Sequence, residues 1–447
     1  MKIRDNIHYP KHEFIKNYPL LSEKILDRTL ADLAEKEDIL VFPTDLSKIK
    51  DLDGDNKIVE GINDSVHFKN IVGFIGQGSE NLVIQSRFSE QNSDYFFNYL
   101  LQKVLNINIV DLETGLSFDQ YFYQLLIYMF PKYLNSAMRK GLYKEYRKFE
   151  YNDSNVRGVL DIARHVRTNI PFRGNIAYST REFTFDNNLM ELVRHTIEFI
   201  KLSKNNAKNI LRSSKMTQNN VAAVIEATPR YQINNRRKII NSNKVTPIRH
   251  AYYTEYRILQ RICLMILMGQ KHDLNSNGNK VKGILFDVAW LWEEYVNLLL
   301  GDDFKHPQNK SKEDGIFLYS EMYKKHRNLR VYPDFYNATT IIDTKYKQLD
   351  SSIKREDRYQ IISYLHILNC KNTGFVYPTK EIGGLDRIGD LSGLGGTIFK
   401  YGLHIPQEVA DFSEFSRKML KSEQDVMINL VAKLNNTVSH GQYEVNP

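Results

Sequence analysis

The sequence predicts an α+β protein of several domains, with a β-rich N-terminal part, a mainly helical middle region and an α/β C-terminal part with a central mixed sheet. Three observations support this fold class. The 447 residues suffice for about three domains of ~150 residues. Hydrophobic content of 42% and aromatic content of 12% exclude a disordered chain, because so much apolar surface can be buried. The hydrophobic pattern also changes twice along the chain.

Residues 1–140 form the first expected domain. Short apolar runs at 39–43, 69–74 and 81–88 are separated by turn residues such as Asp53 to Asn56, which is typical of strands. Residues 95–105 and 118–134 instead carry apolar side chains at helical spacing.

Residues 141–270 form the second expected domain, which is mixed at first and helical from Asn187 onward. Its residues 201–250 contain eleven Lys and Arg but only one acid, Glu226, a net charge of +10. The whole chain carries +8, so the remaining residues sum to −2. A local excess of this kind indicates a surface that binds phosphates, and we assign Arg236, Arg237 and Lys238 to DNA binding. The alternative is a solvated linker or helix face.

Residues 271–447 form the third expected domain. The expected elements, in order, are a helix over 285–300, strands over 315–321, 329–336 and 339–346, a helix over 355–368 and a strand over 374–378. After the last of these strands, six glycines from Gly383 to Gly396 favour a loop over that stretch.

Several classes of protein are excluded. Two cysteines, Cys263 and Cys370, allow neither a disulfide framework nor a four-ligand zinc site based on cysteine, which favours a cytoplasmic protein. No apolar stretch approaches the ~20 residues of a membrane span, and the N-terminus lacks a signal peptide's apolar core. No G-x-x-x-x-G-K-[ST] motif is present, so we do not expect the chain to hydrolyse nucleotides by itself.

Two carboxylates and an amine gather in the third domain. The strands over 329–336 and 339–346 should pair as a hairpin, which places Asp334 near Asp343. Asp343 and Lys345 project from one face, because side chains alternate along a strand. Buried carboxylates need compensation, and a divalent ion with oxygen ligands, Mg²⁺ or Mn²⁺, would supply it. Lys345 could then orient a water or stabilise negative charge on a phosphate.

The spacing P-D-x8-D-x-K from Pro333 to Lys345 resembles the signature of PD-(D/E)XK nucleases. An acid pair, Glu293 and Glu294, lies in the apolar helix before the hairpin, and Gln360 and Tyr364 share one face of the helix after it. The superfamily often places a metal-binding Glu and a Q-x-x-x-Y pattern at these two places. The resemblance therefore implies a nuclease core with a central mixed sheet.

A narrower resemblance, good from about Arg157 to Pro378, is to the McrC family, the nuclease subunits of McrBC-type restriction systems. It is carried by the segment Arg157 to Ile162, by Tyr178, by Glu182 to Asn188, and by Leu291 to Val296, where the family pattern selects Glu293 over Glu294. Over the first ~140 residues little beyond Gly73 and the strand 82–88 matches.

The McrC resemblance implies an Mg²⁺-dependent endonuclease that cuts double-stranded, methylated DNA together with a hexameric AAA+ GTPase of the McrB kind. GTP would bind only to that partner. The chain would stimulate the partner's hydrolysis of GTP through residues 1–140. Asp334, Asp343, the carbonyl of Thr344 and Glu293 would hold the metal, Lys345 would position the nucleophile, and Gln360 and Tyr364 would support the site. Two alternatives stay open: an adaptor that activates the GTPase without cutting, and a stand-alone repair or mobile-element nuclease.

Overall fold

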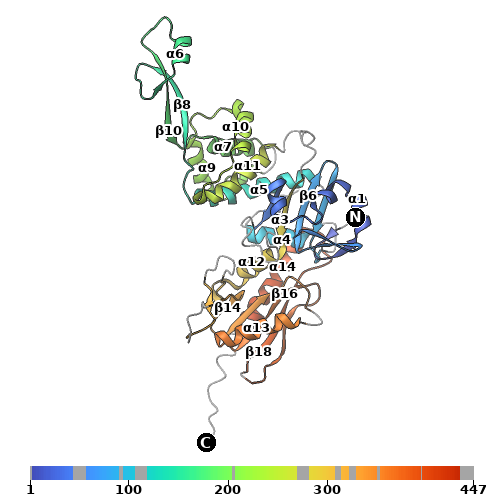
Figure 1. Cartoon of the computed structure of the whole chain (residues 1–447). Coiled ribbons are helices and arrows are strands. Elements are labelled where there is room, and N and C mark those ends of the chain that lie inside the picture. Colours follow the sequence, from blue (N-terminus) through green and yellow to red (C-terminus); the bar gives the residue numbers. More distant parts are fainter. Residues whose placement is uncertain are drawn as a thin grey trace. The chain divides into compact units, whose positions relative to one another are not determined.

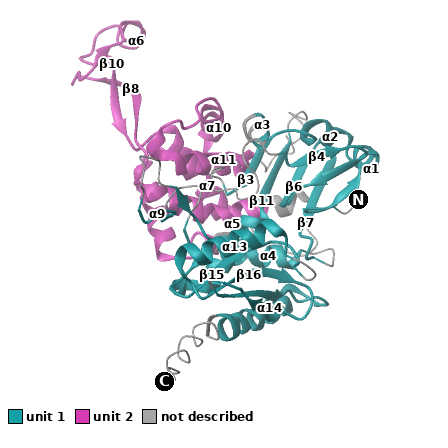
Figure 2. Cartoon of the chain, turned by 60° about the horizontal axis from the view of Figure 1, so that its bottom comes forward, with its two compact units in different colours: residues 1–110, 277–447 teal, residues 111–276 magenta. Residues whose placement is uncertain are grey.

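The computed structural model describes residues 3–43, 57–89, 94–105, 118–203, 207–268, 281–307, 314–321, 329–349, 353–393 and 395–432. The chain forms two compact units, coloured separately in Figure 2. Unit 1 joins Met1–Val110 to Asn277–Pro447, and unit 2 is Asp111–Ser276. The division at 140 and 270 stays a prediction, but in the structure the first and third expected domains both contribute to unit 1. Among the described helices, none has the length and apolar character needed to cross a membrane.

The first sheet of unit 1 combines N-terminal strands with one strand from much later in the chain. Its order is β1 (Ile3–Arg4), β7 (Glu80–Gln85), β6 (Ile71–Gln77), β11 (Lys282–Asp287) and β3 (Asp38–Phe42). A smaller sheet and three helices accompany it: β2 (His8–Pro10), β5 (Ser65–Phe68), β4 (Val59–Ile62), α1 (Lys11–Asn17), α2 (Pro19–Ile25) and α3 (Leu30–Lys36). The strands expected near 39–43, 69–74 and 81–88 are confirmed as β3, β6 and β7.

Strand β11 corrects the expected helix over 285–300. Residues 285–287 are extended and pair with β3 in parallel and with β6 in antiparallel register, and helix α12 begins only at Val288 and ends at Leu300. Asp287 ends the strand and caps the helix, because its carboxylate accepts the backbone N–H groups of Ala289 and Trp290. The apolar runs on both sides of Asp287 do not distinguish a strand from a helix.

Two glycines allow β6 and β11 to lie unusually close. A Cβ on Gly73 would stand 2.1 Å from the backbone oxygen of Ile284, and one on Gly283 would stand 2.3 Å from that of Phe74. Gly73 also has a positive φ of 150°. Any larger residue at either position must therefore push two central strands apart.

The second five-stranded sheet of unit 1 is mixed and lies in the C-terminal part (Figure 1). Its order is β14 (Phe335–Tyr336), β15 (Thr340–Thr344), β16 (Asn372–Thr379), β18 (Thr397–His404) and β17 (Gly384–Asp390). Strands β15, β16 and β18 run parallel, whereas β14 and β17 pair antiparallel at the two edges. Helix α13 (Arg355–Leu368) begins and ends where the sequence predicts, and its Ile361 packs with Phe375 and Ile398 of the sheet.

Two expectations for this part were wrong. The strand expected over 329–336 is split: β13 (Arg330–Val331) pairs with β12 (Ile316–Phe317), and only β14 joins the large sheet. Pro333 lies between them and has no N–H for a continuous ladder. The glycine-dense stretch expected as a loop contains β17, which pairs with β18 and has a bulge between Arg387 and Gly389.

A buried carboxylate joins three helices of unit 1. Glu423 of α14 (Phe412–Val426) accepts hydrogen bonds from the hydroxyls of Tyr99, at 2.7 Å, and Tyr295, at 2.8 Å. Lys103 adds an ion pair of 3.1 Å. Because Tyr99 belongs to α4 (Tyr95–Leu105) and Tyr295 to α12, Glu423 fixes these helices to one another.

Unit 2 is mainly helical, as expected, and carries a long β arm between its first helix and the others (Figure 1). Strands β8 (Glu145–Asp153) and β10 (Ile176–Thr184) pair antiparallel over their whole length, and β9 (Val159–Leu160) and α6 (Ile162–Thr168) lie at the tip. The helices are α5 (Phe118–Met138), α7 (Asn188–Leu202), α8 (Ala207–Ile210), α9 (Lys215–Ala227), α10 (Arg236–Val245) and α11 (Thr254–Met268).

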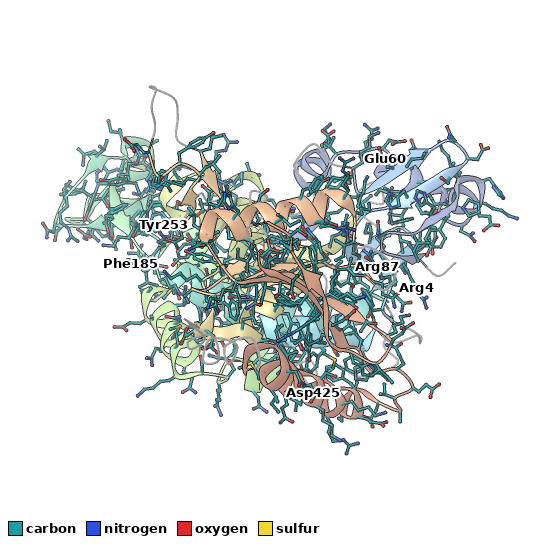
Figure 3. The ribbon with its side chains drawn as sticks, turned by 90° about the horizontal axis from the view of Figure 1, so that it is seen from below. Arg4, Glu60, Arg87, Phe185, Tyr253 and Asp425 are labelled. Atoms are coloured by element: carbon teal, nitrogen blue, oxygen red, sulfur yellow. The ribbon has the colours of Figure 1, made fainter. Side chains whose placement is uncertain are left out.

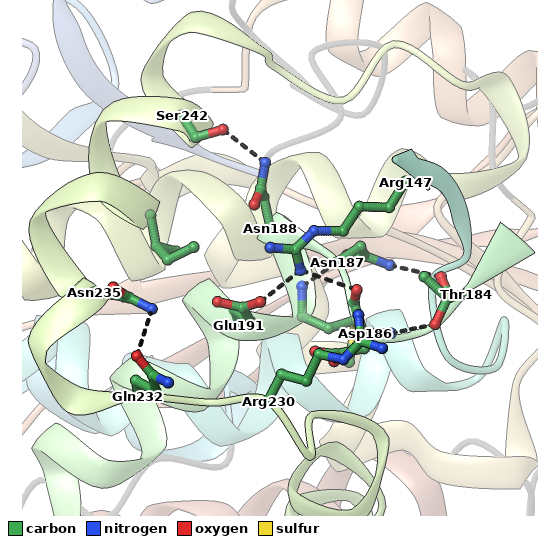
Figure 4. Close-up of polar contacts among 12 residues, drawn as sticks. Arg147, Thr184, Asp186, Asn187, Asn188, Glu191, Arg230, Gln232, Asn235 and Ser242 are labelled. Carbon is green, nitrogen blue, oxygen red and sulfur yellow. Dashed lines mark hydrogen bonds and ion pairs between the residues drawn. The ribbon is translucent and has the colours of Figure 1, made fainter. Parts of the chain in front are cut away.

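Charged side chains fix the base of the arm to α7 (Figure 4). Arg147 of β8 donates to the carbonyl of Asp186, at 3.1 Å, and to the buried carboxylate of Glu191, at 2.6 Å. Asn187, between them, caps α7 by accepting the N–H of Met190. Arg230 approaches Asp186 at 3.9 Å from the other side. These contacts therefore hold the base of the arm against α7.

The glycine pair gives a test of the first sheet. Gly283→Ala should destabilise unit 1 by about 1–3 kcal/mol, because the new methyl group meets a backbone oxygen that cannot move without disturbing β6. Thermal unfolding followed by circular dichroism would measure the change. Gly389→Ala is the matched control, since a Cβ there would meet no atom within 4 Å. Equal unfolding midpoints for the two variants would contradict the close approach of β6 and β11.

Candidate functional site

Asp334 and Asp343 lie opposite each other at one end of the β14–β15 hairpin. Phe335 pairs with Ile342, so the same register continued by one residue sets Asp334 against Asp343. Asp334 is held in place by Thr344, whose backbone N–H and hydroxyl both donate to Oδ2 of Asp334 at 2.8 Å. Asp343 is 2% exposed. The structure thus brings together the two carboxylates that the sequence predicts.

Lys345 completes this group. Its Nζ lies 2.8 Å from Oδ2 of Asp343, which confirms that the two side chains share a face. Burial alone would lower the pKa of Lys345, but the charges of Asp343, Asp334 and Asp357 outweigh burial and raise it. Lys345 is therefore a cation at neutral pH. Its backbone N–H donates to Val376 at 3.0 Å, which continues the sheet by one residue.

Asp357 is a part of the site that sequence reasoning missed. This residue of α13 lies 3.3 Å from Nζ of Lys345 and 2.6 Å from Nζ of Lys347. Although burial acts in the opposite direction, these two lysines lower the pKa of Asp357. Its position three residues before Gln360 puts both on one helical face, and that spacing was the signal available in the sequence.

His306 was also missed. Its Nδ1 lies 2.7 Å from the carbonyl oxygen of Asp334, and its ring stacks on Phe335 with centroids 4.6 Å apart. Because a carbonyl only accepts, Nδ1 carries the proton, and Nε2 faces Oε1 of Glu293 at 4.0 Å. An isolated histidine before a proline gives no pattern from which this contact could be predicted.

The remaining predicted residues lie around this group in different ways. Gln360 donates to the hydroxyl of Tyr364 at 3.2 Å, and that hydroxyl donates to the carbonyl of Tyr332 at 3.4 Å. Burial raises the pKa of Tyr364, and the charges of Asp334 and Asp343 add to the effect. Glu293 is half-buried on α12, next to His306.

The donor set suits a hard cation that retains water. Within the described ranges, no three His, Cys, Asp or Glu side chains are close enough together to hold a metal ion. Asp334, Asp343 and the carbonyl of Thr344 provide oxygen ligands, and Mg²⁺ commonly binds through one or two carboxylates and several waters. The residues present therefore fit Mg²⁺ at Asp334 and Asp343, whereas Glu293 is not drawn into a three-carboxylate cluster.

Comparison with known families identifies the chain. The profile of the McrBC 5-methylcytosine restriction system component matches residues 66–378. The chain belongs to the McrBC family. This membership confirms the resemblance found in the sequence, and the match begins at residue 66, well before the Arg157 from which the resemblance was clear.

Two solved assemblies from Thermococcus gammatolerans are similar to this McrBC-family chain. One is a half-complex from a tetradecameric assembly of McrB AAA+ hexamers with bound McrC, at 15% identity and a TM-score of 0.47, covering 94% of this chain and 99% of that one. The other is the McrBC complex, at 17% identity and a TM-score of 0.29, covering 67% and 86%. Curated proteins gave no match.

The middle segment that resembles the McrC pattern forms the arm of unit 2. Gly158 lies so close to β10 that a Cβ would stand 2.2 Å from the oxygen of Ser179. Asp161 caps α6 by accepting the N–H of Arg164, and the hydroxyl of Tyr178 bonds Asp153. The tip also exposes apolar side chains: Val159, Leu160, Ile162, Val166, Ile170 and Phe172. Such a group is typical of a surface that another molecule covers.

The basic segment of this McrBC-family chain is not one uniform surface. Arg237 and Lys238 of α10 are exposed. Arg236 instead turns inward, with its guanidinium carbon 5.7 Å from the centre of the Phe199 ring. Burial, together with the charges of Arg236 and Arg194, lowers the pKa of His195 to about 4. Lys204 and the side chain of Lys208 lie outside the described residues.

This difference sharpens the test of DNA binding. The double variant Arg237→Glu, Lys238→Glu should weaken binding to duplex DNA at least about tenfold and make the dependence of log K on log salt shallower by about 2, because two phosphate contacts are lost. Fluorescence anisotropy at several salt concentrations would measure both. Lys16→Glu, Arg28→Glu makes the same charge change at exposed sites outside residues 201–250. An unchanged affinity and slope in the α10 variant would remove these residues from the DNA surface.

Proposed function

We propose that this chain is the Mg²⁺-dependent endonuclease subunit of a cytoplasmic, modification-dependent restriction system, and that it cuts methylated double-stranded DNA. The observation that supports this most strongly is the convergence of Asp334, Asp343 and Lys345 at one end of the β14–β15 hairpin, in a member of the McrBC family. The order and spacing of these residues match the PD-(D/E)XK signature, and the mixed sheet that carries them agrees with such a core.

Each residue has a distinct role in this proposal. Asp334, fixed by Thr344, and Asp343, fixed by Lys345, present oxygen atoms on one side of the sheet. Mg²⁺, if held there, would supply charge neutralisation for the phosphate and would make a water more acidic. Lys345, kept cationic by its carboxylate neighbours, orients the attacking water or stabilises the negative charge that develops on the phosphate.

The surrounding residues act on the orientation of these groups. Asp357 holds Lys345 from the side of α13, opposite its contact with Asp343. His306 links the backbone of Asp334 to Glu293, which would reach the metal through a water. Gln360 and Tyr364 support the carboxylates or contact DNA from the exposed face of α13.

We place GTP hydrolysis on a separate AAA+ partner, a hexameric GTPase of the McrB kind. The sequence has no G-x-x-x-x-G-K-[ST] motif, and the matched family is described as a component of a restriction system. In this proposal residues 1–140 contact the partner and stimulate its GTPase activity. GTP reaches the nuclease reaction only through that subunit.

Removing Asp343 or Lys345 tests the proposed chemistry. In the presence of the partner GTPase, GTP and Mg²⁺, Asp343→Asn and Lys345→Ala should each lower the rate of cleavage of methylated plasmid at least about 100-fold, because each removes a group that stabilises the transition state. Stimulation of GTP hydrolysis by the same variants should equal that of the wild type. Asp386→Asn and Lys371→Ala change exposed residues of the same part of the chain and should cut normally.

The outcomes separate the three functions. Wild-type cleavage by both Asp343→Asn and Lys345→Ala would overturn the assigned site. GTPase stimulation without cleavage by any form of the chain would establish the adaptor. Vigorous cutting in the absence of partner and GTP would establish a stand-alone nuclease.

A further inference from the structure

We propose that Tyr346 is a positioning residue for the nuclease reaction, which ties the segment of Lys345 to the turn that follows β7 in the N-terminal sheet. The proposal rests on the nuclease function proposed above. It assigns to Ser86 and Tyr346 a role in cleavage beyond ordinary packing. It also makes the N-terminal sheet a physical part of the catalytic site, within unit 1.

Tyr346 contacts three consecutive residues of that turn. Its hydroxyl shares a hydrogen bond of 2.7 Å with Oγ of Ser86, across 260 residues of sequence. Its ring meets the ring of Phe88 edge-on, with centroids 5.1 Å apart, and the guanidinium carbon of Arg87 lies 4.9 Å from its centre. Tyr346 is 5% exposed and Ser86 is fully buried. Phenylalanine would fill the same space, so the hydroxyl has a purpose that packing alone does not explain.

The turn itself is held on several sides. Arg87 donates its backbone N–H to Oδ1 of Asp5, at 2.6 Å, and its Nε to Oδ2, at 2.9 Å. A terminal nitrogen of Arg87 also contacts Asp5 and Asn70. Asp5 is fully buried and directly follows β1, whose Arg4 is labelled beside Arg87 in Figure 3. Moving Arg87 away would leave the buried carboxylate of Asp5 without its partner, so the turn is held in place.

Asp94 holds the other side of the turn. Its Oδ2 accepts the backbone N–H of Ser86 at 2.5 Å, while its Oδ1 accepts that of Phe97 in the first turn of α4. Oγ of Ser86 accepts the N–H of Phe88 at 3.1 Å in addition to its contact with Tyr346. The backbone of the turn therefore orients the Ser86 hydroxyl that bonds Tyr346. Such support is expected for a catalytic segment.

Tyr346 is joined by a peptide bond to Lys345, the residue that takes part in the proposed chemistry. Tyr346 directly follows Lys345, in the bend that begins where β15 ends at Thr344. Beyond β15, two contacts hold this segment: the backbone bond from Lys345 to Val376 of the C-terminal sheet, and the bond from Tyr346 to Ser86 of the N-terminal part. A displacement of about 1 Å in a catalytic group can cost roughly 100-fold in rate. Removing the Tyr346 hydroxyl should therefore change turnover more than it changes DNA binding.

The test uses the full chain with its GTPase partner, methylated plasmid, GTP and Mg²⁺. Tyr346→Phe and Ser86→Ala should each lower kcat for cleavage about tenfold with KM for DNA and GTPase stimulation unchanged. The double variant should lose no more than Ser86→Ala alone, because Tyr346→Phe removes only the hydrogen bond that the two hydroxyls share, whereas Ser86→Ala also removes the acceptor of the Phe88 N–H. Tyr99→Phe is the matched control, since it removes a buried hydroxyl of the same unit, bonded to Glu423 and distant in sequence from Lys345. It should keep the wild-type kcat.

The results divide cleanly. Wild-type kcat in both Tyr346→Phe and Ser86→Ala would overturn the positioning role, as would an equal loss of kcat in Tyr99→Phe, which would point to general destabilisation. A strictly additive double variant would show that the two hydroxyls do not act together and would also overturn it. If Asp343→Asn cuts as well as the wild type, the nuclease assignment fails first; if only the Tyr346 and Ser86 variants cut normally, the nuclease assignment stands and the positioning role fails.

Discussion

Unit 1 depends on the placement of β11 between β6 and β3. This strand comes from the far side of unit 2 in the sequence, yet it is central in the N-terminal sheet, and Val281 and Leu285 are part of the same core as Ile3, Ile39 and Ile75. Asp287 ends the strand and starts α12 within a single residue. The helix that carries Glu293 is thus directed by a sheet built mostly from the first 90 residues, which links the N-terminal part to the site by backbone geometry.

The charge of Lys345 is determined by the carboxylates that surround it. Lys345 is largely buried, which by itself disfavours its charge, but three carboxylates around it reverse that effect. In return, Lys345 and Lys347 keep Asp357 ionised. The ammonium group is therefore a positive charge held beside Asp343.

Local patterns in the sequence were sufficient to predict much of the structure around Asp334, Asp343 and Lys345. The hairpin around Asn337, helix α13 and the meeting of Asp334, Asp343 and Lys345 all depend on turn chemistry and on the two periodicities of side chains, which can be read directly from the sequence. The errors lie where tertiary context decides. Ile284 to Trp292 is apolar apart from Asp287, so only its partners β3 and β6 distinguish strand from helix. Arg236 belongs to a basic run, but helix rotation turns it toward Phe199 while Arg237 faces water.

The late position of β11 has a consequence for biosynthesis. Strands β3 and β6 leave the ribosome early, but the strand that lies between them follows roughly 200 residues later, which takes on the order of 10–40 seconds at usual translation rates. Unit 2 is a continuous stretch that is synthesised within that interval. Until β11 arrives, the nascent N-terminal sheet has two apolar edges without partners, the kind of surface that aggregates or recruits chaperones. The order of the strands in the gene therefore sets a period of vulnerability during synthesis that the finished protein no longer has.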